Sequence, residues 1–165
     1  MSIAIRPAST AEDLDAIRAL LRRYESEIGF DLGFQGFADE LDALPGDYVP
    51  PAGRLLCADH AGRVVGCVAL RALDEKRCEM KRLYVLPEAR RERAGQALVA
   101  QIVAEARAAG YEAMYLDTAP GMEKAQALYQ RFGFSDVPPY TFNPIPGVRF
   151  MALRLRSKSR HGMPG

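Results

Sequence analysis

The chain has 165 residues, enough for one domain with a sizeable hydrophobic core. Its 22 basic and 21 acidic residues leave a net charge of +1, which argues against a general nucleic-acid surface. No apolar run approaches the length of a membrane span, and the N-terminus lacks the long apolar core of a signal peptide. We therefore expect neither a nucleic acid nor a membrane as partner.

Three cysteines, Cys57, Cys67 and Cys78, form an odd set without metal-ligand spacing. All three lie in apolar, strand-like segments, where a buried thiol is the expected state. There are only two histidines, and His161 lies near the C-terminus, so we expect no zinc or other metal site. This pattern favours a reduced, cytoplasmic setting.

The first half of the chain predicts strands and helices in the order βαα-βββ. Leu14, Ile17, Leu20 and Leu21 recur at helical spacing, and Ser9 or Thr10 is the expected N-cap. A glycine-containing turn after Asp59 predicts a hairpin. The expected elements are a strand over Ile3 to Arg6, a helix ending at Gly29, a helical piece over Phe34 to Leu44, and strands over Arg54 to Asp59, Val64 to Leu70 and from Cys78 to Pro87.

The second half predicts the order αβαβ and then a polar tail. Its elements are a helix over Gly95 to Ala109, a strand over Ala113 to Leu116, a helix over Met122 to Phe132 and a strand over Arg149 to Leu155. There is no repeat and no interdomain linker. We expect one α/β domain over residues 1–156, with a mixed sheet flanked by helices, and a loose tail over residues 157–165.

The strand that starts at Cys78 runs into a basic turn, and that turn opens a helix at Gly95. A helix N-terminus leaves backbone N–H groups unpaired and carries a partial positive charge, so it can bind phosphate. Arginines in the turn add donors suited to phosphate oxygens. A ligand with a pyrophosphate group is one hypothesis, and an ordinary connection with a solvated basic turn is the other.

These residues resemble the GNAT superfamily of acyl-CoA-dependent N-acetyltransferases over nearly the whole chain. The family has a pyrophosphate loop between its fourth strand and third helix, which Arg90, Arg93 and Gly95 match. Arg93 stands where the family prefers glycine, and it can still serve if its backbone has the ordinary right-handed helical conformation. The resemblance implies an acetyl-CoA site, splayed fourth and fifth strands, and cofactor contacts from Leu83, Tyr84, Val85, Arg90, Arg91, Arg93, Ala94, Gly95 and Gln96.

A second match lies between Ala125 and Phe134, which is similar to the family's A-x-x-L-Y-x-x-x-G-F helix and turn. The resemblance implies that Tyr129 lies beside the sulfur of CoA and protonates the leaving thiolate. From the residues alone, the favoured interpretation is that Tyr129 is a core residue with a satisfied hydroxyl. Met122 departs from the pattern, because many relatives have an asparagine there.

Glu79 resembles the family's catalytic glutamate in position and type. Amine acetylation requires a proton to leave the ammonium, directly or through water. Partial burial could raise the pKa of this carboxylate. The alternative is that Glu79 pairs with an arginine of a neighbouring strand, such as Arg71, and does no chemistry. Strand alternation predicts two opposite faces, one with Glu79, Lys81, Leu83 and Val85 and the other with Met80, Arg82 and Tyr84.

The resemblance also implies how the acyl group is held and moved. The pantetheine arm enters between the splayed strands and pairs with the fourth strand, and an amide near Leu83 polarises the thioester carbonyl. Direct transfer is expected, and Cys78 is not an expected nucleophile. The residues expected to contact the acceptor are Phe34, Gln35, Glu40, Asp117, Tyr140 and Asn143.

The expected function is therefore acetyl-CoA-dependent N-acetylation of a primary amine, on a small molecule or a protein. Dimers are common in the superfamily, so a homodimer is possible. One alternative is a non-catalytic acyl-CoA binding or sensing module on the same fold. A nucleotide-binding domain unrelated to CoA is disfavoured, because neither G-x-x-x-x-G-K-[ST] nor G-x-G-x-x-G is present.

Overall fold

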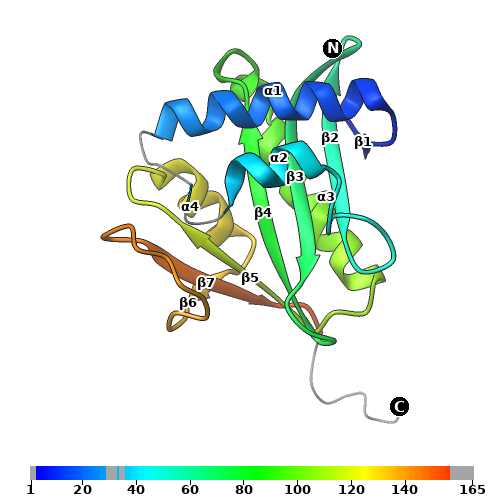
Figure 1. Ribbon diagram of the computed structural model, residues 1–165. Coiled ribbons are helices and arrows are strands. Elements are labelled where there is room, and N and C mark those ends of the chain that lie inside the picture. Colours follow the sequence, from blue (N-terminus) through cyan, green and yellow to red (C-terminus); the bar gives the residue numbers. More distant parts are fainter. Residues whose placement is uncertain (1–2, 29–32, 34–35, 157–165) are drawn as a thin grey trace.

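The structure, a computed structural model, describes residues 3–28, 33 and 36–156, with only the backbone of residues 91 and 92. The predicted elements are present with boundaries shifted by a few residues, while a 3-10 helix (η2) and a two-residue strand (β6) were not predicted (Figure 1). Along the chain the elements are β1 (Ile3–Pro7), α1 (Ala11–Ile28), α2 (Phe37–Ala43), β2 (Arg54–His60), β3 (Arg63–Ala72), β4 (Arg77–Val85), η2 (Pro87–Glu92), α3 (Ala94–Ala108), β5 (Ala113–Thr118), α4 (Glu123–Arg131), β6 (Ser135–Asp136) and β7 (Arg149–Arg154).

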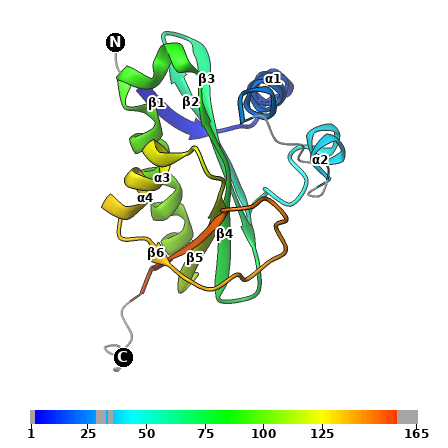
Figure 2. The same cartoon turned by 90° about the vertical axis from the view of Figure 1, so that its left-hand side faces the viewer.

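One seven-stranded sheet organises the molecule, in the order β1-β2-β3-β4-β5-β7-β6. Only β4 and β5 pair in parallel, and the other neighbours are antiparallel. Viewed along the sheet, α1 and α2 cover one face and α3 and α4 cover the other (Figure 2). The chain is thus a single α/β domain with a mixed, mostly antiparallel sheet, as predicted.

The start of α1 is fixed by reciprocal capping bonds. The Thr10 hydroxyl accepts a hydrogen bond from the backbone N–H of Asp13 at 3.0 Å, and the Asp13 carboxylate accepts one from the N–H of Ser9 at 3.0 Å. Arg6 of β1 also binds Asp13, and its hydrogen bond holds the pKa of Asp13 well below the usual range. The predicted cap is therefore confirmed at Thr10, and it ties α1 to the first strand.

A β-bulge interrupts β4 at Arg82. The register against β3 passes from Ala69 opposite Lys81 to Cys67 opposite Tyr84, so β4 contains one extra residue, and Arg82 has a φ of 63°. The predicted alternation is consequently wrong beyond Lys81.

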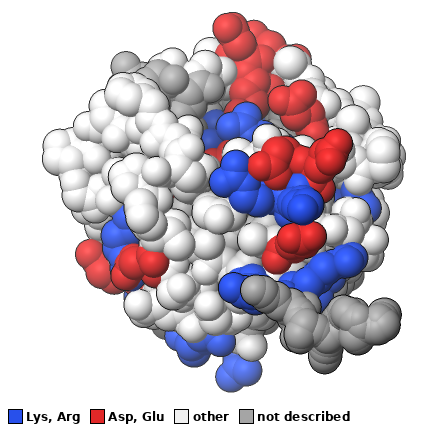
Figure 3. Space-filling model, turned by 90° about the horizontal axis from the view of Figure 1, so that it is seen from below, with Lys and Arg blue, Asp and Glu red and all other residues white. Residues whose placement is uncertain are grey.

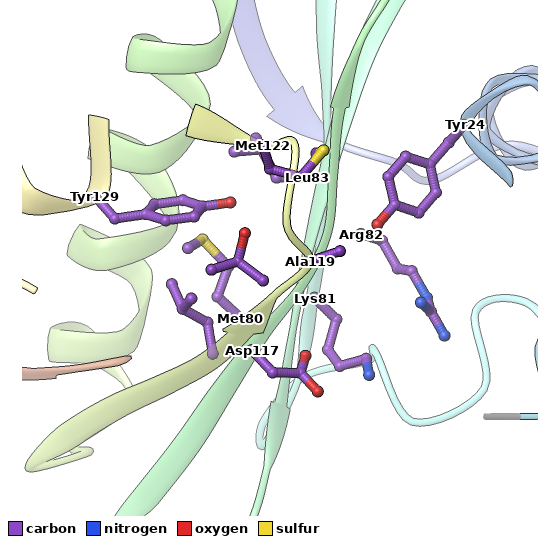
Figure 4. A pocket seen from close by; sticks show the side chains of 11 residues that line it. Tyr24, Met80, Lys81, Arg82, Leu83, Asp117, Ala119, Met122 and Tyr129 are labelled. Carbon is purple, nitrogen blue, oxygen red and sulfur yellow. The ribbon is translucent and has the colours of Figure 1, made fainter. Parts of the chain in front are cut away.

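The contacts of β4 show the result of this shift. Lys81 and Arg82 leave the strand on the same side in Figure 4. Val85 lies on the opposite face, because it packs beside Gly66 together with Leu98 of α3. The bulge therefore moves Leu83 and Val85 away from the face that carries Glu79 and Lys81.

The parallel pair of strands separates soon after it forms. β4 and β5 pair only at Arg77 with Ala113, Cys78 with Met114, and Glu79 with Tyr115. Beyond these three pairs the strands diverge, as Figure 1 shows. We call this opening the β4–β5 fork, and it confirms the predicted splay.

The expected state of the thiols is confirmed, because Cys57, Cys67 and Cys78 are buried and free. Within the described ranges, no helix has the length and apolar character that crossing a membrane would require. On the face seen from below, acidic and basic side chains lie next to one another across the centre (Figure 3). The balanced composition is thus mirrored in a mixed charge distribution on that face.

Candidate active site

A small cavity of about 60 Å³, partly open to solvent, occupies the β4–β5 fork. Three residues predicted to act here line it, namely Leu83, Asp117 and Tyr129 (Figure 4). No site role was predicted for the remaining lining residues, which are Tyr24, Met80, Lys81, Arg82, Leu116, Thr118, Ala119 and Met122. Tyr24 continues the apolar spacing of α1 from Leu20 and Leu21, and Lys81 shares a strand face with Glu79, so these two had a signal in the sequence.

Tyr129 points its hydroxyl into this cavity from α4 (Figure 4). Its ring packs against Phe134 with 5.8 Å between centroids, and its hydroxyl has no hydrogen-bond partner among the described residues. Burial raises the pKa of Tyr129 above its ordinary value, so the side chain is a neutral phenol at pH 7. It can donate a proton to an atom in the cavity.

Glu79 lies on the last β4–β5 pair, at the base of the β4–β5 fork, and is only 1% exposed. Its carboxylate accepts a hydrogen bond from the Tyr140 hydroxyl at 2.5 Å and another from Nε of Arg71 at 3.0 Å. The ion pair between Glu79 and Arg71, which was the alternative considered from the sequence, is therefore present. Glu79 is not among the residues that line the cavity.

Two residues of the long loop before β7, Tyr140 and Asn143, contact predicted site residues on the sheet. Tyr140 is held edge-on against Tyr115 and Phe150, with 5.2 and 5.7 Å between ring centroids. Asn143 donates from Nδ2 to the Asp117 carboxylate at 3.0 Å. The structure thus brings Tyr140 to Glu79 and Asn143 to Asp117, joining four residues predicted for the site in two pairs.

Glu40, which was predicted to contact the acceptor, binds Arg82 and Tyr48 of the protein itself. Arg82 donates to it twice, from Nε and Nη2, each at 2.8 Å, and Tyr48 donates from its hydroxyl at 2.9 Å. Burial alone would raise the pKa of Glu40, but the hydrogen bonds and charge of Arg82 lower it below its ordinary value. Glu40 does not line the cavity. The other two predicted acceptor contacts, Phe34 and Gln35, lie outside the described residues.

The predicted phosphate loop ends at Arg93, whose φ is 63°. The backbone is thus left-handed, a conformation that glycine adopts without strain, and the condition under which arginine could serve in place of glycine is not met. The Arg93 side chain is exposed. Helix α3 follows at once, so the amides of Ala94, Gly95 and Gln96 lie in a first turn where they have no intrahelical acceptor.

Arg90 folds back from this loop onto the protein. It donates from Nε to the backbone oxygen of Val85 at 3.0 Å and from Nη2 to Glu27 at 3.2 Å. Its guanidinium also lies over the Tyr84 ring, 5.7 Å from the centroid, and Tyr84 donates from its hydroxyl to Glu27 at 2.6 Å. Arg90 therefore ties the loop to β4 and α1. Arg91 lies in η2, and its side chain is outside the described part of the chain.

Within residues 3–28, 33 and 36–156, no group of three His, Cys, Asp or Glu side chains is placed to hold a metal ion. The polar side chains that line the cavity are two phenols, a lysine, an arginine, a carboxylate and the hydroxyl of Thr118. This set supports proton transfer and binding of a polar group.

Comparisons with known proteins give consistent results. Residues 14–134 match the model of the acetyltransferase (GNAT) family. An uncharacterized N-acetyltransferase of Schizosaccharomyces pombe is 41% identical over 156 residues, which cover 93% of this chain and 96% of that protein. An acetyltransferase structure from Streptococcus agalactiae aligns with a TM-score of 0.79 at 20% identity, over 93% of this chain and 99% of the other.

A further solved structure contains a ligand. The PaiA N-acetyltransferase of Thermoplasma acidophilum, in complex with coenzyme A, aligns with a TM-score of 0.74 at 18% identity. The alignment covers 93% of this chain and 99% of that one. At this level of identity, the solved structures establish the shared fold.

Proposed function

The chain belongs to the acetyltransferase (GNAT) family, and from this we propose that it transfers an acetyl group from acetyl-CoA directly to a primary amine. The observation that carries the proposal is the cavity in the β4–β5 fork, into which Tyr129 directs a hydroxyl without a partner among the described residues. A neutral phenol at that place suits the protonation of a leaving thiolate. A substrate amine would then meet the thioester inside this cavity, which is partly open to solvent.

We place the pantetheine arm in the β4–β5 fork, where it would pair with the free edge of β4 as an added strand does. The pyrophosphate would lie at the first turn of α3, against the amides of Ala94, Gly95 and Gln96. A backbone amide near Leu83 would polarise the thioester carbonyl. A complex of the same fold with coenzyme A supports this placement.

In the proposed reaction the amine attacks the thioester carbonyl carbon, and Tyr129 gives its proton to the departing sulfur. Glu79 is the proposed base. Its carboxylate does not line the cavity, so it would receive the amine proton through water or through the Tyr140 hydroxyl that binds it. No covalent enzyme intermediate is required.

One observation favours the second candidate, a non-catalytic acyl-CoA binding module. The two Glu79 carboxylate oxygens already accept hydrogen bonds from Arg71 and Tyr140, as in a structural ion pair. The two candidates differ in turnover, because both require acetyl-CoA to bind.

The test is to measure acetyl-CoA binding by calorimetry and thermal shift, and then thiol release with a panel of primary amines. Ligand at 100 times its Kd should add about 2.7 kcal/mol to the free energy of unfolding. Binding with amine-dependent thiol release supports the enzyme. Binding without release by any amine supports the binding module, and no binding at millimolar acetyl-CoA contradicts both.

A further inference from the structure

Lys81 is the buried lysine of the described chain, and it lies in the candidate active site. Its side chain is 9% exposed, whereas the other two described lysines, Lys76 and Lys124, are exposed. It lines the cavity in the β4–β5 fork, one residue before the bulge at Arg82.

The cavity places this amine across from Tyr129. Tyr129 enters the cavity from α4, while Lys81 leaves β4 on the other side, next to Asp117 (Figure 4). In the proposed function the thioester lies between these two sides, with its sulfur toward Tyr129. A lysine side chain has a flexible four-carbon stem, so its amine can approach a carbonyl held in the same cavity.

We propose that Lys81 is itself an acetyl acceptor, modified at Nζ by the acetyl-CoA bound to the same molecule. This inference rests on the proposed function, because it uses the same bound thioester. It adds a modification site to the protein and makes acetylation of Lys81 a competitor of transfer to an external amine.

The charges around Lys81 support this role. Burial is the largest influence and lowers the pKa of the Lys81 ammonium, and Arg82 lowers it further. Glu79 and Asp117 act in the opposite direction but do not restore the ordinary value. A larger fraction of neutral amine is therefore present at Lys81 than on an exposed lysine, and only the neutral amine attacks a thioester.

The reaction balances without another reagent. The Nζ lone pair forms a bond to the carbonyl carbon, and the bond from that carbon to sulfur breaks. The sulfur takes a proton from Tyr129, and the nitrogen loses one, which returns to the tyrosine through water. The products are Nζ-acetyl-lysine and coenzyme A. Because an amide is a far weaker acyl donor than a thioester, the acetyl group stays on Lys81, which loses its positive charge.

The experiment incubates the full chain with isotopically labelled acetyl-CoA and maps the label by peptide mass spectrometry. Lys76 and Lys124 serve as internal controls, because spontaneous acetylation reaches exposed amines first. Holding the amine beside the thioester should make labelling at Lys81 at least about tenfold faster than at either control. Reaction within one molecule also predicts a first-order rate that does not change when the protein is diluted.

Two variants sharpen the result. Lys81→Arg keeps the positive charge but offers no acetylatable amine, so labelling should fall to the level of the exposed lysines. The matched control, Lys76→Arg, should leave labelling of Lys81 unchanged. If Lys81→Arg does not fold, the map of the unaltered protein decides the question alone.

The inference is overturned if acetyl-CoA raises Tm while the label stays on Lys76, Lys124 or Lys158, or appears on no lysine. A Lys81 rate that rises in proportion to protein concentration also overturns it, because transfer then occurs between molecules. Absence of any Tm change with acetyl-CoA is a different failure, which removes the proposed function and this inference with it.

Discussion

Tyr129 and Glu79 both lie at the β4–β5 fork, but they differ in whether their polar groups are already hydrogen-bonded. The Tyr129 hydroxyl enters the cavity without a partner among the described residues, and burial keeps it protonated. Glu79 is buried at the base of the β4–β5 fork, where Arg71 and Tyr140 both bind its carboxylate. The site therefore has an available proton donor, Tyr129, and a carboxylate, Glu79, that already accepts hydrogen bonds.

Replacing Tyr129 by Phe should remove the donor and keep the ring packing. We expect kcat for thiol release to fall by about 10²- to 10⁴-fold, as for loss of a general acid, with little change in acetyl-CoA affinity. The matched control is Tyr111→Phe, which removes a hydroxyl bound to the backbone oxygen of Ala52, a residue that does not line the cavity. Equal losses of kcat and affinity in Tyr129→Phe would assign Tyr129 a packing role.

Glu79→Gln tests the base. If Glu79 takes the amine proton, the variant should lose the acidic limb of the pH–rate profile, because the group whose protonation stops the reaction is gone. Kinetics across the acidic range, with acetyl-CoA saturating, would measure this. If Glu79→Gln keeps the acidic limb of the wild-type profile and loses only stability, Glu79 has a structural role as a partner of Arg71 and Tyr140.

Among the elements, β4 decides the shape of the site. Its bulge puts Arg82 in a left-handed conformation and turns its side chain toward α2, where it binds Glu40 and lies over the Phe37 ring at 4.9 Å. The Arg82 side chain is 4% exposed and that of Glu40 18% exposed, so the pair is largely buried. Helix α2 and the bulge are thus joined by one ion pair.

A double-mutant cycle of Arg82→Met and Glu40→Gln should show this connection. Either single change should lower the free energy of unfolding by about 3 kcal/mol, because it removes the oppositely charged group from a largely buried ion pair. The double variant should lose less than the sum, with a coupling of about 0.5–3 kcal/mol in denaturant unfolding. An exposed pair at the β3–β4 turn, Arg77 with Asp74, provides the control, and Arg77→Met should have far less effect.

The stability that the Arg82–Glu40 ion pair contributes should depend on pH. The pKa of Glu40 is lower in the folded protein than in the unfolded chain, so its contribution is complete above the unfolded value of about 4.3. That contribution is lost as the pH falls through the folded pKa. Glu40→Gln should therefore be less stable than the unaltered protein at neutral pH, and the difference should shrink in acid. Parallel stability curves down to low pH would contradict this sign.

The sequence predicted the element order because apolar periodicity and glycine or proline stops mark most elements. It also predicted the splay and the place of Tyr129, both through family resemblance. It did not predict the bulge, because a positive φ at an arginine such as Arg82 has no local signature. For the same reason the sequence left the backbone conformation of Arg93 open. Strand alternation assumes an even ladder, so one extra residue reversed the assignment of Leu83 and Val85.

The C-terminal end of the described chain is held to the rest of the protein up to its last residues. Leu155 is buried, its N–H donates to the backbone oxygen of Glu112 at 2.8 Å, and its own oxygen accepts from Arg107 at 3.2 Å. A chain ending at Arg156 would retain all of these contacts, and the domain boundary after residue 156 stays a prediction.

Truncation should locate this boundary. Removing residues 157–165 should leave both Tm and acetyl-CoA binding unchanged. Removing residues 154–165 should cost about 1.5–3 kcal/mol for the lost burial of Leu155. For a chain of this size, each kcal/mol lowers Tm by about 2–4 °C, which calorimetry resolves. A lower Tm in the shorter deletion would place the boundary beyond Arg156.

The three-residue junction of β4 and β5 has a mechanical consequence. The strands β1 to β4 form one continuous ladder, and β5, β7 and β6 form another. Because only three residue pairs join the two ladders, tilting one against the other would disturb few hydrogen bonds, and we expect this seam to act as a hinge. Such tilting widens or narrows the gap between the ladders. Amide exchange at Met80 and Leu116, just beyond the seam, should therefore be faster than at the centre of either ladder.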